Sequence, residues 1–306
     1  MELIKPGTTI DFLGKRVWCF LFSAILFAVS GYVWVERGEG KYGIDFKGGN
    51  ELIVKIEGAQ STDAVRGALE KGGVKEPIVQ AFESGSSDYS IRLSDVDANT
   101  ARTQVEGAIK GAFEGRFEVL QTDYVGPTIG SELKRKALIA ALLGLIGICL
   151  YVAFRFEIAF AMGALVALAH DLVVALGVYL LVGHDLTMAS LAAALTIVGY
   201  SVNDTIVIFD RLREEMRKRK NYDLESLMNE VMNAMLGRTI ITSGLTLLSA
   251  LALLIFGGGA IADLSVFLVA GIISGTYSTI YIASPIVLWW ENWQRARRSV
   301  AQPSAS

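Results

Sequence analysis

Cysteine and histidine are scarce in this sequence, with two of each among 306 residues. Cys19 and Cys149 both fall inside long apolar runs, so neither can form a disulfide within the polar segment that separates them. No metal-binding spacing surrounds either residue. These absences exclude a disulfide-stapled domain and a cysteine-based metal site, and they predict two free, packed thiols.

The polar segment at 36–136 contains neither histidine nor cysteine, and its serines have no neighbouring base to activate them. Its stretch GIDFKGG, at 43–49, is rich in glycine but lacks the Lys-Ser or Lys-Thr ending of a phosphate-binding loop. It also precedes a predicted strand rather than a helix, so we interpret it as a tight turn at the entry to the segment. No catalytic residues, bound cofactor or metal are predicted, and the chain is not expected to be an enzyme.

Apolar residues are abundant, at 52% of the chain, and the mean hydropathy is +0.45, which is high for a soluble protein. A helix that spans a membrane needs about 20 predominantly apolar residues. Segments with this property lie at 17–35, 137–154, 159–182, 186–209, 239–256 and 264–290. The sequence therefore predicts an α-helical polytopic membrane protein with six transmembrane helices.

The first predicted span has an alternative interpretation as a cleaved signal peptide. Lys15 and Arg16 supply a basic start, and AVS at 28–30 weakly resembles a cleavage site. The apolar run continues past this point to Val35, so an uncleaved helix is favoured.

Lysine and arginine accumulate on one side of the predicted membrane. With regular alternation, the residues that share this side are Lys5, Lys15, Arg16, Arg155, Arg211, Arg213, Arg217, Lys218, Arg219, Lys220, Arg295, Arg297 and Arg298. The short opposite loops, 183–185 and 257–263, contain no lysine or arginine. Because basic residues favour cytoplasmic loops, the termini 1–16 and 291–306 are predicted to be cytoplasmic and 36–136 extracytoplasmic. The basic run at 211–220 is interpreted as a solvated topogenic cluster, with binding of a cytoplasmic partner or anionic lipid as the alternative.

The extracytoplasmic segment alternates strand-like and helix-like stretches. Strands are predicted at 51–56, 77–82, 89–93 and 116–125, with a polar turn at 83–88, and helices at 61–73 and 97–113. This β-α-β-β-α-β order predicts an α+β domain of the ferredoxin-like type between the first and second transmembrane helices.

Ionisable residues lie in or near three of the predicted spans: His170 and Asp171, Asp204, and Arg238. An aspartate at a membrane helix centre costs about 3 kcal/mol, and such residues commonly serve proton relays. Asp204 and Arg238 are predicted to lie at similar depths, where an ion pair is reasonable. Movement of Arg238 toward or away from Asp204 would release or capture a proton.

A purely structural ion pair between helices is the alternative for Asp204 and Arg238. His170 is expected mainly to form a hydrogen bond with a neighbouring helix. Gly271 and Gly275, like Ser274 and Ser278, are four residues apart, which predicts close packing against another span of this chain or of a partner.

Several motifs, taken together in this order, are highly specific. They are GIDFKGG, VGPTIG at 125–130, FRFE at 154–157, ALAHD at 167–171, GYSVNDTIVIFDRLRE at 199–214, GRTIITSG at 237–244 and FGGG at 256–259. With them, nearly the whole chain resembles the SecF family, the smaller half of the SecDF protein-export complex. Phe209 replaces a small polar residue that is common in the family, and this change touches no ionisable group.

The resemblance implies six spans of a resistance-nodulation-division type transporter in the bacterial cytoplasmic (inner) membrane, paired with SecD. It also implies that proton flow completes the export of unfolded precursor polypeptides beyond the SecYEG channel and SecA, with the proton gradient as the energy source and no nucleic acid as partner. The family's proton site corresponds to Asp204 and Arg238, with Asp171 as a weaker member. Asn203 is expected to orient this site by hydrogen bonding.

Two functions remain open at this stage. The chain is either a proton-coupled subunit that promotes late-stage export, or a non-transporting scaffold that stabilises SecD and SecYEG. A small-molecule proton antiporter is more remote, because six spans are half of such a transporter. The sequence does not distinguish proton from sodium coupling, although the nearby Arg238 favours protons.

Overall fold

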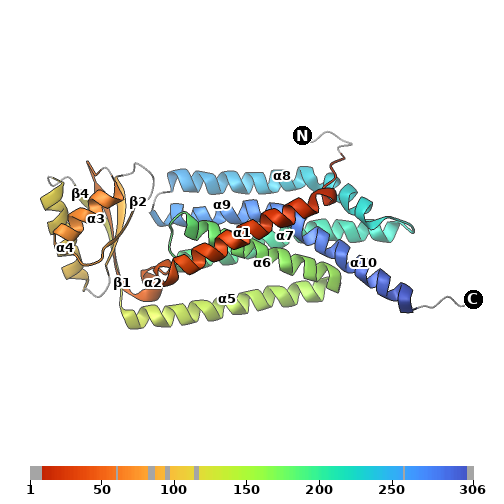
Figure 1. Ribbon diagram of the computed structural model, residues 1–306, viewed down its shortest axis with the longest axis horizontal. Coiled ribbons are helices and arrows are strands. Elements are labelled where there is room, and N and C mark those ends of the chain that lie inside the picture. Colours follow the sequence, from red (N-terminus) through yellow and green to blue (C-terminus); the bar gives the residue numbers. More distant parts are fainter. Residues whose placement is uncertain are drawn as a thin grey trace, which may run out of the picture. The chain divides into compact units, whose positions relative to one another are not determined.

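The computed structural model describes residues 9–59, 61–81, 87–93, 97–113, 117–257 and 259–301. The chain forms two compact units (Figure 1). The helical unit comprises Met1–Arg37, Ala141–Val182 and Ala189–Ser306, and the sheet unit comprises Gly38–Ala140 and Gly183–Met188. Parts of the predicted termini, including Lys5, and most of the predicted turn at 83–88 lie outside the described residues.

The helical unit is built from long helices. These are α1 (Arg16–Glu36), α5 (Pro127–Arg155), which continues from the sheet unit, α6 (Ile158–Leu181), α7 (Met188–Lys218), α8 (Leu224–Phe256), α9 (Gly259–Ser278) and α10 (Ser284–Ala301). Among the described residues, the segments long and apolar enough to cross a membrane are Leu13–Glu36, Thr128–Arg155, Ile158–Leu181, Met188–Lys218, Leu224–Phe256 and Ile261–Arg297. The predicted number of six membrane-length helices is confirmed.

Helices α7 and α8 extend well beyond the predicted spans. Hydropathy marks only the apolar part of a helix, whereas the polar extension of α7 is stabilised by pairs spaced along one face. The Lys218 ammonium lies 2.6 Å from Glu214, and the Arg211 guanidinium lies 3.0 Å from Glu215. Asp223 begins α8 by accepting a hydrogen bond from the Ser226 amide at 2.9 Å.

Helix α6 is buried along most of its length, and α1, α9 and α10 pack against it. Helix α9 also packs closely on α7. A Cβ added to Gly271 would lie 2.5 Å from the Ile197 side chain, and one added to Gly275 would lie 3.2 Å from Ser201. The predicted contact through these glycines is therefore formed within the chain.

A π-helix, η3 (Thr279–Ala283), joins α9 to α10. Pro285 follows it directly and cannot donate the backbone hydrogen bond that a regular α-helix would direct to the carbonyl of Tyr281. The Ser284 hydroxyl donates to the Thr279 carbonyl at 3.0 Å, across the widened turn. The last membrane-length segment is thus one helix with a π-type irregularity in its interior.

The sheet unit contains four antiparallel strands in the spatial order β2-β3-β1-β4. Along the chain the elements are η2 (Gly38–Lys41), α2 (Ile44–Lys47), β1 (Gly49–Ile56), α3 (Thr62–Lys71), β2 (Ile78–Ala81), β3 (Asp88–Leu93), α4 (Ala98–Ala112) and β4 (Phe117–Val125). Alternate residues of β1, namely Leu52, Val54 and Ile56, form one apolar core with Leu69 of α3 and Ile109 of α4. The predicted alternation of strands and helices is found in this unit.

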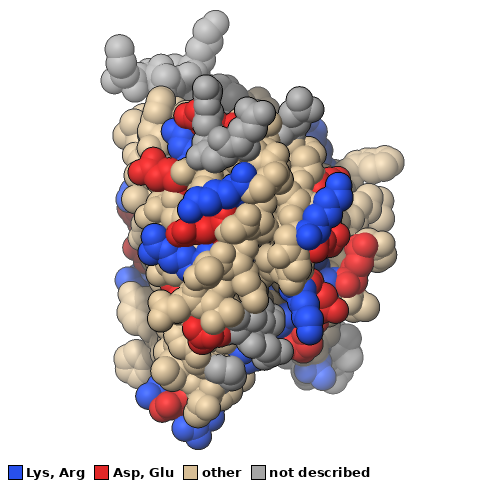
Figure 2. All heavy atoms as spheres, turned by 90° about the vertical axis from the view of Figure 1, so that its left-hand side faces the viewer, with Lys and Arg blue, Asp and Glu red and all other residues tan. Residues whose placement is uncertain are grey.

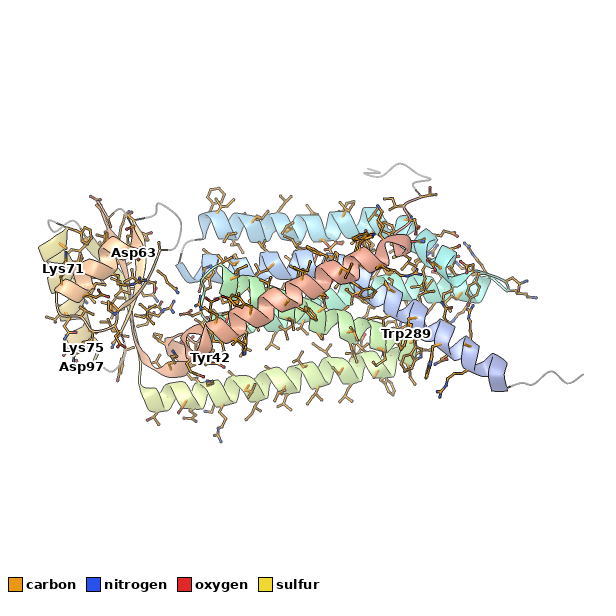
Figure 3. All side chains as sticks on the ribbon, viewed as in Figure 1. Tyr42, Asp63, Lys71, Lys75, Asp97 and Trp289 are labelled. Atoms are coloured by element: carbon orange, nitrogen blue, oxygen red, sulfur yellow. The ribbon has the colours of Figure 1, made fainter. Side chains whose placement is uncertain are left out.

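The helices of this unit begin at capping side chains, and the surface of the unit carries charges of both signs. Ser61 accepts a hydrogen bond from the Ala64 amide, and Asp97 accepts one from the Thr100 amide at 3.0 Å. Figure 3 labels Asp97 at the start of α4. Figure 2 shows acidic and basic side chains interspersed over the face of this unit, without a large area of one sign.

The GIDFKGG stretch forms the turn that leads into β1. Gly48 and Gly49 have φ values of 81° and 123°, and a Cβ on Gly49 would lie 2.7 Å from the Leu93 carbonyl oxygen. Gly130, from the VGPTIG stretch, approaches so closely that its Cβ would lie 2.8 Å from the Gly48 nitrogen. Both motifs therefore serve one tight backbone junction, as the interpretation of a turn predicts.

The loop between α6 and α7, Gly183–Met188, belongs to the sheet unit. The Leu186 amide donates to the Lys41 carbonyl at 2.7 Å, and the Gly43 amide donates to the Leu186 carbonyl at 2.8 Å. Asp185 forms an ion pair with Arg92 of β3. The sequence drew attention to this loop only through its lack of lysine and arginine.

Candidate functional site

Asp204 lies in the interior of α7 and is partly buried. The Ser243 hydroxyl of α8 donates a hydrogen bond of 2.9 Å to its Oδ2 atom. A carboxylate inside a membrane-length helix requires such a partner, because lipid offers none. Asp204 thus contacts α8, as the sequence predicted, but through a serine that the sequence analysis did not select.

The predicted ion pair between Asp204 and Arg238 is not formed in this structure. Neither residue makes an ion pair within 4.0 Å in the part of the chain that the structure describes, and Arg238 is exposed. Arg238 precedes Ser243 by five residues, which places it about 7.5 Å along α8 and about 140° around it. Arg238 therefore lies on a different face of α8 from Ser243, which contacts Asp204. An ion pair between Asp204 and Arg238 requires Arg238 to move.

Asn203 is also exposed, and its side chain makes no hydrogen bond within the described residues. Its neighbour Asp204 is oriented by Ser243 instead. The expected orienting role of Asn203 is therefore not seen in this arrangement. Ser243 belongs to the GRTIITSG motif, which was the only indication of its role in the sequence. Serine and threonine are too common in membrane helices for this one residue to be selected as a partner of Asp204.

Helix α8 carries a polar stripe beside this site. Arg238, Thr242, Thr246 and Ser249 recur at helical spacing, and the three hydroxyls donate to carbonyls four residues earlier at 2.9–3.0 Å. Arg238, Thr242 and Ser249 are exposed in the chain by itself. A guanidinium facing hydrocarbon is costly, so Arg238 requires a polar cover, whereas the three hydroxyls are already bonded to their own helix.

A cavity of about 240 Å³ lies between α7, α8 and α9, and its lining includes Tyr200, Thr246 and Ser249. Tyr200 is one helical turn from Asp204 on α7. Its hydroxyl is buried and makes no hydrogen bond to any described residue. Most of the lining side chains are apolar, namely Ile197, Ala250, Leu253, Leu268 and Ile272, and apolar cavities of this kind do not hold ordered water.

Asp171, on α6, occupies a separate and fully buried cluster, with 1% of its surface exposed. Its Oδ2 atom accepts hydrogen bonds from Ser201 at 2.5 Å and from Ser278 at 2.7 Å. Its Oδ1 atom accepts one from Ser274 at 2.7 Å and lies 3.1 Å from Nδ1 of His170. The structure therefore does not bring Asp171 into contact with Asp204, although Ser201 is one turn before Asp204 on α7.

His170 links this cluster to α1. Its Nε2 atom lies 3.0 Å from the Ser23 hydroxyl, and the Ser23 hydroxyl lies 3.1 Å from that of Tyr277. The expected hydrogen bond between His170 and a neighbouring helix is confirmed. Ser274 and Ser278, predicted only as small packing residues, act here as hydrogen-bond donors to Asp171.

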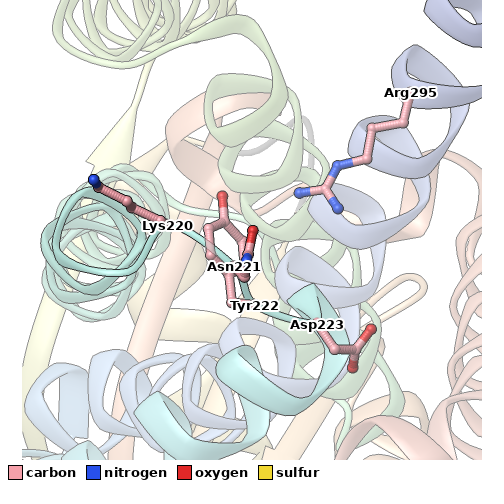
Figure 4. A pocket seen from close by; sticks show the side chains of 5 residues that line it. All are labelled: Lys220, Asn221, Tyr222, Asp223 and Arg295. Atoms are coloured by element: carbon pink, nitrogen blue, oxygen red, sulfur yellow. The ribbon is translucent and has the colours of Figure 1, made fainter.

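The basic run after the apolar part of α7 is largely neutralised by glutamates. Arg219 forms hydrogen bonds of 2.8 and 2.6 Å to Glu230, and Lys218 binds Glu214. Beyond it, a cavity of about 780 Å³ is lined by Lys220, Asn221, Tyr222, Asp223 and Arg295 (Figure 4). The pairing of these basic residues with glutamates favours a solvated cluster over a dedicated anion-binding site.

Comparison with known proteins decides the family. The family described as "Protein export membrane protein SecD/SecF, C-terminal" matches residues 104–293. The protein translocase subunit SecF of Rickettsia conorii (strain ATCC VR-613 / Malish 7) is 37% identical over 295 residues, which cover 95% of each chain. The chain belongs to the SecF family of protein translocase subunits.

Other members and a solved structure agree with this SecF assignment. SecF of Calditerrivibrio nitroreducens is 38% identical over 293 residues, covering 94% of this chain and 96% of its own. The crystal structure of SecDF from Thermus thermophilus, a translocon-associated membrane protein, matches with a TM-score of 0.83 and 35% identity. That match covers 94% of this chain but 39% of the SecDF chain, so this SecF chain spans about two fifths of it. The chain is thus a multi-pass membrane subunit for protein transport and not a conventional enzyme.

Proposed function

We propose that this SecF chain uses the proton motive force to promote late-stage export of unfolded precursor proteins across the cytoplasmic membrane. The observation that carries this proposal is Asp204, a membrane-helix carboxylate held by Ser243 and without a cationic partner within 4.0 Å. Arg238 lies on the same helix as Ser243, about 140° around it, and must move to reach Asp204. The proton gradient supplies the energy, and no bound cofactor is proposed.

The proposed cycle depends on two arrangements of α7 and α8. When Arg238 approaches Asp204, its charge stabilises the ionised carboxylate and a proton leaves. When Arg238 is withdrawn, no cation offsets the burial of Asp204, so the neutral acid is favoured and a proton is taken up, with Ser243 still bonded to the carboxyl group. Each proton that crosses about 100 mV carries about 2.3 kcal/mol, enough to bias such an equilibrium. Asn203 and Asp171 are proposed as further members of the proton pathway.

We propose SecD as the membrane partner of this chain. Arg238, Thr242 and Ser249 of the stripe are exposed, and a second set of helices carrying a complementary carboxylate would cover them. The SecDF relative contains more than twice the length matched by this chain. SecYEG, SecA and the exported polypeptide are proposed as further partners in the lipid bilayer, with no nucleic acid involved.

The sheet unit is proposed to be a ferredoxin-like extracytoplasmic domain. Its β1-α3-β2-β3-α4-β4 order and its antiparallel β2-β3-β1-β4 sheet support this proposal. The proposed orientation, with both termini cytoplasmic, is supported by the basic residues toward the C-terminal ends of α7 and α10.

The test measures release of a precursor from the outer face of SecF-depleted cells that express wild type or Asp204→Asn. Asp210→Asn is the matched control, because Asp210 lies on the same helix but is exposed and 3.6 Å from Arg155. Stalled release in Asp204→Asn alone, with SecD still recovered in a pull-down, is the expected result. Normal release would remove the proton-coupling proposal and favour the scaffold function. Replacement of sodium in the medium separates proton from sodium coupling.

A further inference from the structure

The strongest unassigned feature is the buried cluster around His170 and Asp171, where α1, α6, α7 and α9 meet. His170 is 3% exposed and Asp171 is 1% exposed. No lysine or arginine side chain contacts either residue among the described contacts. A buried carboxylate without a cation is costly, so the positions of the protons in this cluster matter.

The hydrogen bonds of Tyr277, on α9, determine whether Nε2 of His170 carries a proton. The Tyr277 hydroxyl donates its single proton to the Cys19 carbonyl at 2.7 Å. In the bond between Ser23 and Tyr277, Ser23 must therefore be the donor. The Ser23 oxygen then accepts from His170, and Nε2 of His170 carries a proton.

The second proton follows from the other side of the ring. Nδ1 of His170 lies 3.1 Å from Oδ1 of Asp171, while the Ser274 proton is directed to that oxygen at 2.7 Å. Without a proton between them, two lone pairs would face each other in a buried site. With one, the arrangement is either an imidazolium beside a carboxylate or a neutral imidazole beside a carboxylic acid. In both cases the pair is neutral overall.

We propose that His170 and Asp171 form a second proton-binding centre, separate from Asp204, which holds one transferable proton between Nδ1 and Oδ1. This inference rests on the proposed proton-driven function for its role in export. Removal of the proton would leave one negative charge in the core of the helical unit and lone-pair repulsion between the two side chains. The surrounding helices must rearrange when that proton leaves.

The groups that face the pair are few. Among the described residues, α1 presents Ser23 and Cys19, α7 presents Ser201, and α9 presents Ser274, Tyr277 and Ser278. The ring centroid of Tyr281 in η3 lies 5.3 Å from that of Tyr277. The carboxylate of Asp204 is directed to Ser243 on α8 instead. Tyr277 and Tyr281 are thus the nearby groups that can ionise, along with the Cys19 thiol.

The π-helix places this centre where a rearrangement is possible. Ser278 donates to Asp171 and directly precedes η3, and Thr279, its first residue, is 2.9 Å from the Thr205 hydroxyl of α7. Thr205 follows Asp204 in the sequence. The irregular turn therefore connects the second centre to the segment of α7 that carries the first, through contacts that the loss of one proton would disturb.

The test uses solid-state NMR of ¹⁵N-histidine-labelled protein, together with SecD, in lipid bilayers. The chain contains only His170 and His184, and the signals missing in His170→Gln identify His170. We expect Nε2 to be protonated throughout and the Nδ1 signal to change when the shared proton is removed at raised pH. Asp171→Asn should abolish this change, whereas Asp204→Asn should preserve it.

Unchanging signals of His170 in the wild type, or an unprotonated Nε2, would overturn the inference. If His170→Gln does not fold, Ser23→Ala offers a second assignment, because it removes the acceptor of Nε2, together with a hydrogen bond to Tyr277, and should shift the Nε2 signal of His170. If the His170 signal changes with pH but Asp204→Asn exports normally, the second proton-binding centre is supported and the proposed export mechanism is rejected. If the His170 signals do not change with pH but Asp204→Asn is defective in export, the second centre is rejected and the proposed export mechanism is supported.

Discussion

Asp185, in the loop between α6 and α7, forms an ion pair with Arg92 on β3 of the sheet unit. The Arg92 guanidinium also lies 3.0 Å from Glu51 and donates to Gln80 at 2.8 Å. The Asp185 side chain is 2% exposed, so this charge depends on its partner. Both residues belong to the sheet unit, so the pair holds the 183–188 loop against β3.

Asp185→Asn should therefore loosen the loop and β3. Removal of one partner from a buried pair typically costs about 3–5 kcal/mol. Because Arg92 keeps Glu51 at 3.0 Å, the cost here should fall below that range. Hydrogen–deuterium exchange should increase at β3 and at residues 183–188. The control is Arg66→Met, whose exposed pair with Asp63 at 3.1 Å should contribute about 0–1 kcal/mol. Equal exchange in both variants would contradict a supporting role for the buried pair.

The fold was predictable where it depends on local pattern. Long apolar runs marked the membrane-length helices, and the glycines of 43–49 marked a turn. Long-range contacts were not predictable in this way. The pairing of Asp185 with Arg92 joins positions far apart in the sequence, and Pro285 signals a break in a helix without showing that the preceding turn becomes a π-helix.

The candidate site follows the same rule. Asp204 and Asp171 stand out because charges inside apolar runs are rare. Their partners Ser243, Ser201 and Ser278 do not stand out, because serine is frequent in membrane helices and its role depends on which face it occupies. The expected pair of Asp204 with Arg238 used depth along the helix alone, and the angular position of Arg238 on α8 defeats it in this arrangement.

Gly271→Ala tests the close contact between α9 and α7. The added Cβ would lie 2.5 Å from Ile197, whose branched side chain is 1% exposed and has little room to move. Overpacking of this kind typically costs about 1–3 kcal/mol, so the melting temperature of the solubilised protein should fall. Ile197→Ala added to this variant should restore part of the loss. Gly147→Ala, with no atom within 4 Å of its Cβ, should be nearly neutral.

Asp97 gives the sheet unit an acid-sensitive helix cap. Hydrogen bonds from the Thr100 side chain and backbone hold the pKa of Asp97 below its ordinary value of 3.8. The ionised cap therefore stabilises α4 above the ordinary pKa, and this contribution is lost as pH falls through the lower pKa of the folded state. Asp97→Asn keeps a capping oxygen but cannot titrate. The Thr100 amide signal in NMR should move in acid in the wild type and stay fixed in the variant.

Ser243→Ala removes the hydrogen bond that holds Asp204 on its present side of α8. A hydrogen bond to a neutral acid contributes about 0.5–1.5 kcal/mol, so its loss should favour the arrangement in which Asp204 is ionised beside Arg238. Precursor release should fall by up to about an order of magnitude, as expected for about 1.4 kcal/mol in the balance of two states. Ser243→Thr retains the hydroxyl and should preserve release. If both variants export normally while SecD still binds, Ser243 does not control Asp204, and the proposed alternation between Ser243 and Arg238 must be abandoned.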